Sequence, residues 1–174
     1  CIGVDAYKRY SNTYKEIKGI QFIQSTFELL DVNKLGSDYD CISLWNCLEH
    51  IYDLKQLLIV IKKLLKSNGL LFIMVPNIES LATRIIREKS PTFGWKHVSH
   101  FCVESLVTLM KDSDLKKVHI ETAISEIDNI KSYLSGAYPY HGYGDPENLF
   151  DFITPEYIHS RMLGSRIIGI FKNA

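Results

Sequence analysis

The sequence has no excess of either charge and no long apolar run. Twenty Lys and Arg balance twenty Asp and Glu, so the formal net charge at pH 7 is +0. Without a basic surface, a nucleic-acid partner is not expected. The longest apolar runs, 57–61 and 70–75, fall far short of the roughly 18 residues that a membrane span requires. The sequence therefore predicts neither a nucleic-acid partner nor a membrane span.

Close pairs of cysteines are also lacking. The four cysteines are Cys1, Cys41, Cys47 and Cys102, and no two of them form a CxxC pair. A disulfide framework or a zinc knuckle is therefore not expected, and the pattern favours free thiols in a reducing cytoplasm. The chain opens on Cys1-Ile2-Gly3-Val4-Asp5 without an initiator Met or a signal peptide. We expect part of the fold to precede Cys1.

What is present predicts one folded domain. The 174 residues are 46% hydrophobic and 23% charged, which is typical of a globular chain. Apolar residues from Leu54 to Leu65 follow the spacing of one helical face, with Asp53 as N-cap and Asn68-Gly69 as the stop. Residues 70–75 are apolar at every position, which indicates a strand covered on both faces and ended by Pro76-Asn77.

Further short strands are expected over residues 1–4, 20–24, 40–45, 118–124 and 165–171, with helical stretches between most of them. This alternation predicts an α/β, Rossmann-like open sheet of mostly parallel strands with helices on both faces. Residues 1–124 form its core, 125–164 an insertion that serves as a substrate lid, and 165–174 the last strand. No internal repeat interrupts this order.

An open parallel sheet binds ligands beyond the carboxyl ends of its strands. Asp5 follows the first predicted strand, where a short acid can accept both ribose hydroxyls of a nucleotide. The alternative is that Asp5 only caps the next helix. The spacing leaves both interpretations open.

The segment from Tyr39 to Asn77 carries a family resemblance. It contains Tyr39-Asp40 at a strand opening, Leu48-Glu49-His50, Leu65-Lys66-Ser67-Asn68-Gly69 and Pro76-Asn77. This order resembles the class I S-adenosylmethionine-dependent methyltransferases, in particular the branch of ubiquinone-biosynthesis O-methyltransferases. The resemblance extends over most of residues 1–124, and the segment 164–166 looks like the start of the family's last strand.

The resemblance implies S-adenosylmethionine as the cofactor. Asp5 would hold the ribose, Thr26 and Phe27 would flank the adenine, and Trp45 would line the cofactor. Thr26 stands where the family usually has an acid, and an uncharged hydroxyl makes a weaker contact. The family's first strand and glycine-rich loop would lie before Cys1. These 174 residues are therefore expected to bind the cofactor weakly and to leave an open position in the sheet, whose exposed edge favours self-association.

Three histidines are candidate bases for methyl transfer to oxygen: His50, His97 and His100. His50 and His100 are the catalytic candidates, although a structural role in its loop is an alternative for His50. His97-x-x-His100 with Cys102 makes a poor tetrahedral set for zinc, so no metal is expected.

Substrate selection is predicted in two places. The first is Trp95 and His97, which precede the helical stretch expected before the strand at 118–124. The second is a stretch rich in Tyr, Gly and Pro within residues 132–157, which supplies Tyr138, Tyr140, His141 and Tyr143. A tyrosine offers a flat apolar face with a polar tip, which suits a ring-bearing or sugar-like acceptor. The alternative is a surface loop whose tyrosines pack on the sheet.

The sequence thus predicts an enzyme that methylates a small molecule, at oxygen. The rival is a non-catalytic domain of the same fold that binds a partner protein. Two features favour this rival: no glycine-rich loop lies in these residues, and Thr26 replaces the family's acid. Leu48-Glu49-His50 and Asp5 favour the enzyme. A nicotinamide oxidoreductase would share the acid at the strand end but would need a glycine fingerprint, which these residues lack.

Overall fold

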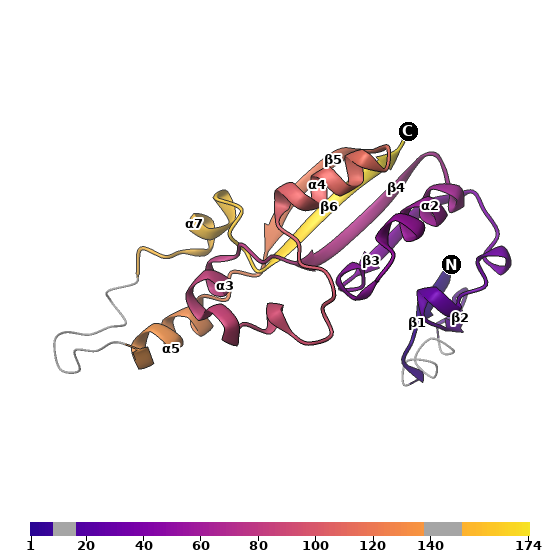
Figure 1. Cartoon of the computed structure of the whole chain (residues 1–174). Helices are drawn as coiled ribbons and strands as arrows, with labels where there is room; N and C mark the ends of the chain where they lie inside the picture. The colour runs from indigo at the N-terminus through magenta and orange to yellow at the C-terminus, as the bar shows by residue number, and fades with distance from the viewer. Residues whose placement is uncertain (9–16, 138–150) are drawn as a thin grey trace.

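The structure is a computed structural model of the chain, and it describes residues 1–8, 17–137 and 151–174 (Figure 1). The strands are β1 (Ile2–Asp5), β2 (Gln21–Gln24), β3 (Tyr39–Trp45), β4 (Leu65–Pro76), β5 (Leu115–Ala123) and β6 (Arg166–Asn173). The α-helices are α2 (Leu54–Leu64), α3 (Leu81–Ile86), α4 (Val103–Asp112), α5 (Ile127–Ala137) and α7 (Pro155–Ser160). Single 3₁₀ turns are η2 (Phe27–Leu29), η3 (Val32–Lys34), η4 (Leu48–His50), η5 (Arg87–Lys89) and η6 (Pro91–Phe93).

The strands form two separate sheets. β1 and β2 pair in parallel, with Ile2 opposite Gln21 and Asp5 opposite Gln24. The other four strands have the order β3-β4-β6-β5, in which β3 and β4 are parallel and β6 is antiparallel to both of its neighbours. Among the described residues, β1, β2, β3 and β5 each have only one strand neighbour, and the expected open position between β1 and β3 stays a prediction.

The α/β, Rossmann-like fold is confirmed, but the sheet is less parallel than the sequence indicates. β6 comes last in the chain and lies between β4 and β5. Composition explains this order: β6 contributes the buried side chains of Ile167 and Phe171, whereas β5 carries Lys116 and Lys117 in exposed positions. The apolar strand occupies the interior and the charged strand forms the edge, where lysines discourage pairing with another chain.

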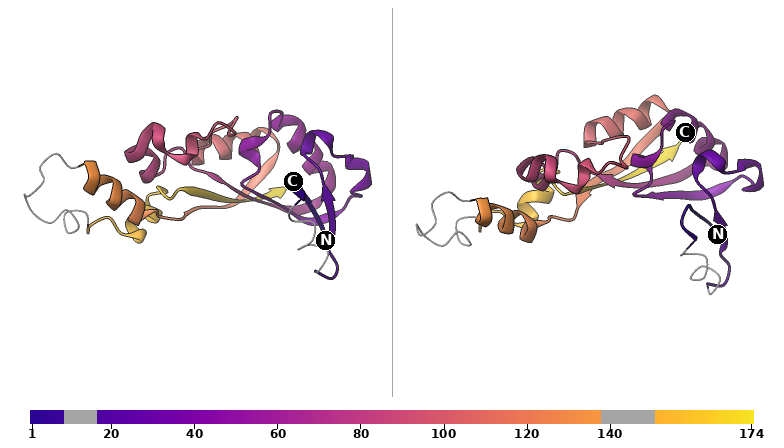
Figure 2. Two further views of the ribbon diagram at one scale, coloured as in Figure 1. Left: turned by 90° about the horizontal axis from the view of Figure 1, so that it is seen from below. Right: turned by 60° about the horizontal axis from the view of Figure 1, so that its bottom comes forward.

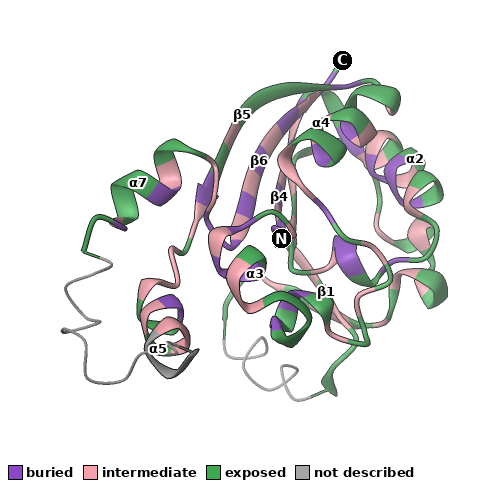
Figure 3. Cartoon of the chain, turned by 60° about the vertical axis from the view of Figure 1, so that its left-hand side comes forward, coloured by how far each residue is buried: buried purple, intermediate pink, exposed green. Residues whose placement is uncertain are grey.

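Helices α2 and α4 pack against one face of the four-stranded sheet (Figure 2). Buried residues of α2 and α4 meet the buried side chains of Leu71, Ile73 and Val75 from β4. The alternate β4 residues Leu70, Phe72 and Met74 are only half-buried. The second face of this strand is therefore less covered than the first in the described part of the chain. The alternation of purple and pink along β4 and β6 in Figure 3 shows the difference.

Asp53 sets the start of α2 as expected, whereas the helix ends at Leu64, before the predicted stop at Asn68-Gly69, which lies within β4. The Asp53 carboxylate accepts a hydrogen bond from the backbone N–H of Gln56 at 2.9 Å. After the helix, Asn68 adopts a φ of 67°, a left-handed conformation that asparagine tolerates better than most residues. No helix in the described ranges is long and apolar enough to cross a bilayer.

The insertion begins and ends on a second, smaller core. Ile130 of α5 and Ile158 of α7 are buried against Ala82 of α3, together with Ile153. Residues 125–137 and 151–164 therefore dock on the helix that follows β4. Their role as a substrate lid stays a prediction.

Asn77 joins three parts of the molecule just after β4. It is 0% exposed, and its Nδ2 donates to the backbone oxygens of Gly164 at 2.9 Å and Met162 at 3.2 Å, just before β6. Its Oδ1 accepts from the N–H of Glu79 at the approach to α3. A parallel bridge connects it to Phe101. The buried amide of Asn77 thus fixes the exit of β4 and the entry of β6, and the backbone bridge at the same residue holds the loop before α4.

We predict that Asn77→Ala lowers the free energy of unfolding by about 2–4 kcal/mol, since buried backbone groups lose their hydrogen-bond partners. Urea unfolding followed by circular dichroism measures this change. The control Asn33→Ala alters an exposed residue of η3 and is expected to change stability by less than about 0.5 kcal/mol. Equal stability of the two variants would contradict the role assigned to Asn77.

Candidate functional site

The cofactor candidates Asp5, Thr26 and Phe27 come together at the carboxyl ends of β1 and β2. These ends are adjacent because Asp5 pairs with Gln24 and its carbonyl accepts from the N–H of Ser25 at 3.1 Å. The Asp5 carboxylate accepts from the backbone N–H of Tyr7 through Oδ1 at 2.7 Å. This contact closes a local turn, whereas a cap on a following helix stays a prediction, and the second carboxylate oxygen has no protein partner among the described residues.

Trp45 ends β3 and is 56% exposed. The half-buried Ile42 and Leu44 of the same strand pack against the core beneath α2 and α4. Because strand side chains alternate between faces, Trp45 points to the opposite face. It is accessible to a ligand there.

Cys47 links the ends of these strands. Burial raises the pKa of its thiol, and the nearby carboxylates of Glu49, Asp5 and Glu28 raise that pKa further. Cys47, at the start of η4, and Phe27, which follows β2, pack against the same core. The acid of the expected cofactor site and the Leu48-Glu49-His50 segment thus share one end of the molecule.

The η4 turn places a carboxylate inside the protein. Leu48 is fully buried, and Glu49 beside it is only 1% exposed. Burial raises the pKa of the Glu49 carboxyl, because desolvation disfavours its charged form. Its Oε2 has no hydrogen-bond partner among the described residues. His50, the next residue, lies at the surface with its Nε2 4.0 Å from Glu49 Oε1.

The loop that carries His97 and His100 is docked on the same turn. The N–H groups of Val98 and Ser99 donate to the carbonyl oxygen of Glu49 at 2.9 and 3.2 Å. The ring centroids of His50 and His97 are 5.0 Å apart, and those of His97 and His100 are 6.4 Å apart. The structure therefore brings all three candidate bases into one cluster.

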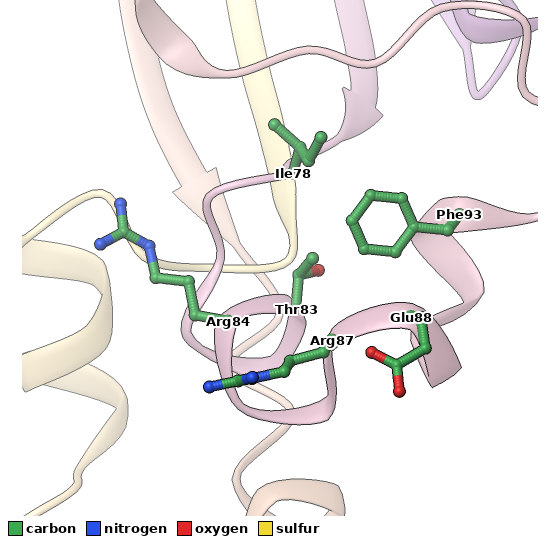
Figure 4. Close-up of a pocket in the computed structure, with 6 residues that line it drawn as sticks. All are labelled: Ile78, Thr83, Arg84, Arg87, Glu88 and Phe93. Atoms are coloured by element: carbon green, nitrogen blue, oxygen red, sulfur yellow. The ribbon is translucent and has the colours of Figure 1, made fainter.

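An open pocket of about 320 Å³ adjoins this cluster (Figure 4). Its lining residues are Ile78, Thr83, Arg84, Arg87, Glu88 and Phe93. The Phe93 ring lines the pocket and lies 5.6 Å from the ring of His100, centroid to centroid, so that His100 is next to the pocket. Ile78 and Phe93 give the pocket an apolar side, and the two arginines bring positive charge.

The other sequence candidates are placed differently. Trp95 is 89% exposed, and the ammonium of Lys96 lies 5.1 Å from its ring centroid. Cys102 is the N-cap of α4, where its sulfur accepts from the N–H of Ser105. It does not join the two histidines as a ligand. The remaining substrate candidates, Tyr138, Tyr140, His141 and Tyr143, lie outside the described residues.

Sequence reasoning missed three members of this region. Glu49 belongs to the Leu48-Glu49-His50 motif, but its burial depends on tertiary packing and cannot be predicted from the sequence. Glu28 lies two residues after Thr26, and its charge reaches Cys47. Phe93 precedes the histidines by a few residues, and only the fold places its ring against His100.

The comparisons identify the class of protein. Residues 1–120 match a family model described as a methyltransferase domain. This match covers more than half of the chain, so the protein belongs to the methyltransferase-domain family. It is a class I S-adenosylmethionine-dependent methyltransferase by fold, and S-adenosylmethionine is its cofactor. The ubiquinone-biosynthesis branch stays a prediction.

Solved structures show the same fold. The chain is similar to a SAM-dependent methyltransferase from Thermotoga maritima, with 16% identity, a TM-score of 0.63, and coverage of 99% of this chain and 72% of that one. It is also similar to one from Archaeoglobus fulgidus, with 18% identity, a TM-score of 0.61, and coverage of 98% and 75%. One from Mesorhizobium loti has 13% identity and a TM-score of 0.59, over 98% and 79%. No curated protein sequence matches the chain.

Proposed function

We propose that the protein transfers a methyl group from S-adenosylmethionine to an oxygen atom of a small-molecule acceptor. The observation that carries this proposal is that Cys47, at the start of the η4 turn of the histidine cluster, packs against the same core as Phe27, which follows β2 at the cofactor end. Cofactor and acceptor sites would therefore be contiguous, which direct transfer of a methyl group requires.

The residues at the end of the β1–β2 sheet fit a nucleoside. Asp5 keeps a carboxylate oxygen for a ribose hydroxyl, and the Thr26 side chain is exposed beside the half-buried ring of Phe27. Trp45 would line the cofactor from the end of β3. When bound, the cofactor supplies an electrophilic methyl group on a positive sulfonium.

His100 is the better placed of the two expected bases. Its ring is exposed, lies beside the Phe93 pocket, and has no hydrogen-bond partner in the described part of the chain. His50 instead contacts the backbone oxygen of Lys96 at 2.9 Å through Nδ1. His100 would take the hydroxyl proton of the acceptor as its oxygen attacks. The acceptor would occupy the pocket, with Trp95 and the segment 132–157 as further contacts.

We predict that Asp5→Asn weakens S-adenosylmethionine binding about 10- to 100-fold, because a hydrogen bond to a charged group contributes about 1.5–3 kcal/mol. Equilibrium dialysis with labelled cofactor, extended to millimolar concentrations, measures this change in the full chain. Asp31→Asn is the matched control, since Asp31 caps η3 outside this cluster. Equal affinities of the two variants would exclude Asp5 from the cofactor site.

We predict that His100→Gln lowers kcat about 10²- to 10⁴-fold, the usual contribution of a general base, while cofactor affinity is unchanged. The assay follows radiolabelled methyl transfer to a panel of catechols, sugars and amines. His119→Gln is the control, because His119 is exposed on β5 and pairs with Glu121. Equal rates of both variants would reject His100 as base, and transfer to amines alone would reject oxygen as the acceptor atom.

We propose in addition that the free edge of β3 supports self-association, because an unpaired strand edge offers its N–H and C=O groups to a second copy. Sedimentation velocity should show a concentration-dependent dimer. Cys41→Lys adds a charge to an exposed residue of β3 and should weaken the dimer, whereas Ser37→Lys in the preceding loop should not. A monomer at all concentrations would contradict this proposal.

A further inference from the structure

Glu49, His50 and His97 form a compact cluster of potential ligands. One ligand atom from each side chain lies within 4.8 Å of the others. Glu49 and His50 come from η4, and His97 comes from the loop that donates two backbone hydrogen bonds to the Glu49 carbonyl. The cluster is therefore held by backbone structure on both sides. The proposed transfer reaction, which uses His100 as base, leaves it without a role.

Both histidines are held in the tautomer that a metal ligand needs. Nδ1 of His50 lies 2.9 Å from the backbone oxygen of Lys96, and Nδ1 of His97 lies 2.9 Å from that of Thr92. A carbonyl oxygen can only accept, so Nδ1 carries the hydrogen in each ring. The lone pair of each neutral ring is then on Nε2. Metal-binding histidines are commonly oriented by such a second hydrogen bond.

Glu49 supplies a group that lacks a partner. Its side chain is almost fully buried, and Oε2 has no hydrogen bond among the described residues. Burying a carboxylate without a partner is costly, and such groups are usually paired or coordinate a metal. The ring of His50 approaches this carboxylate, with Nε2 at 4.0 Å from Oε1. A cation between these three side chains would satisfy the free oxygen.

We propose that Glu49, His50 and His97 form a binding site for a divalent transition-metal ion such as zinc. Two imidazoles and one carboxylate are a known ligand set for zinc, with a fourth position left open, whereas magnesium and calcium prefer oxygen ligands alone. Zinc bonds of about 2.0–2.2 Å place ligand atoms about 3.3–3.6 Å apart in a tetrahedral site. The distances between the ligand atoms, now up to 4.8 Å, therefore have to shorten by about 1 Å to form the site. A movement of the exposed His50 ring allows this change.

A metal here would also act on the acceptor. An oxygen in the open position would be a ligand of the ion, and a Lewis acid lowers the pKa of a bound hydroxyl. This use of the ion rests on the proposed function, whereas binding of the ion does not. It assigns His50 to the metal and leaves His100 as the base.

Cobalt is the probe, because its visible absorption reports the number and type of ligands. Metal-free full chain titrated with Co²⁺ should develop absorption that saturates at one ion per chain and is displaced by Zn²⁺. His97→Gln and His50→Gln should each weaken binding more than about 100-fold, beyond the effect of losing an outer-shell partner. His119→Gln, which removes an exposed histidine on another strand, should bind as the parent does.

Glu49→Gln keeps the shape of the side chain but removes its charge, and is expected to weaken binding similarly. If this variant fails to fold by circular dichroism, the two histidine variants still decide the question, since His50 is exposed. The proposal is overturned if no ion binds, or if binding persists unchanged in both His50→Gln and His97→Gln. Metal binding without methyl transfer would count against the proposed function alone, and methyl transfer without metal binding would overturn the metal site alone.

Discussion

The hydrogen bonds of Asn77 are the constraint on which the remainder of this molecule depends. The residue leaves the sheet at the end of β4, and its buried amide bonds the backbone that leads into β6 and the backbone that leads into α3. Its bridge to Phe101 fixes the loop that precedes α4. That loop carries His97 and His100, so the backbone beside the buried Asn77 also positions the histidines, through the hydrogen bond from the N–H of Ile78 to the oxygen of Phe101.

The docking of this loop on η4 is the second step in the same chain of contacts. The Glu49 carbonyl receives the N–H groups of Val98 and Ser99, while His50 and His97 contact backbone oxygens of the loop. The hydrogen bonds from Val98 and Ser99 to the Glu49 carbonyl are between main-chain atoms, so they do not depend on the identity of these side chains. The side chains of Glu49, His50 and His97 are then free to serve chemistry, and the burial of Glu49 is a cost that a purely structural turn would have no reason to bear.

The sequence predicts the local elements well because their signals are local. The helix after Asp53 has a cap and a regular apolar face, and α2 begins at that cap; it ends at Leu64, before the left-handed Asn68, which lies in β4. The Pro76-Asn77 pair ends β4 as expected. Sheet order depends instead on which strands are most apolar, so the interior position of β6 and the charged edge at β5 appear only when all strands are compared.

The candidate site shows the same division. Asp5 is predicted from a strand end, Thr26 and Phe27 only from the family resemblance, and parallel pairing of β1 with β2 brings them together. The sequence indicated no metal, because it compared only His97, His100 and Cys102, which are neighbours along the chain. Glu49 and His50 lie more than forty residues earlier and join His97 only through the loop that docks on η4. Spacing can disclose ligands that lie on one element, whereas ligands assembled from two elements require the packing that the buried Asn77 and the Glu49 carbonyl provide.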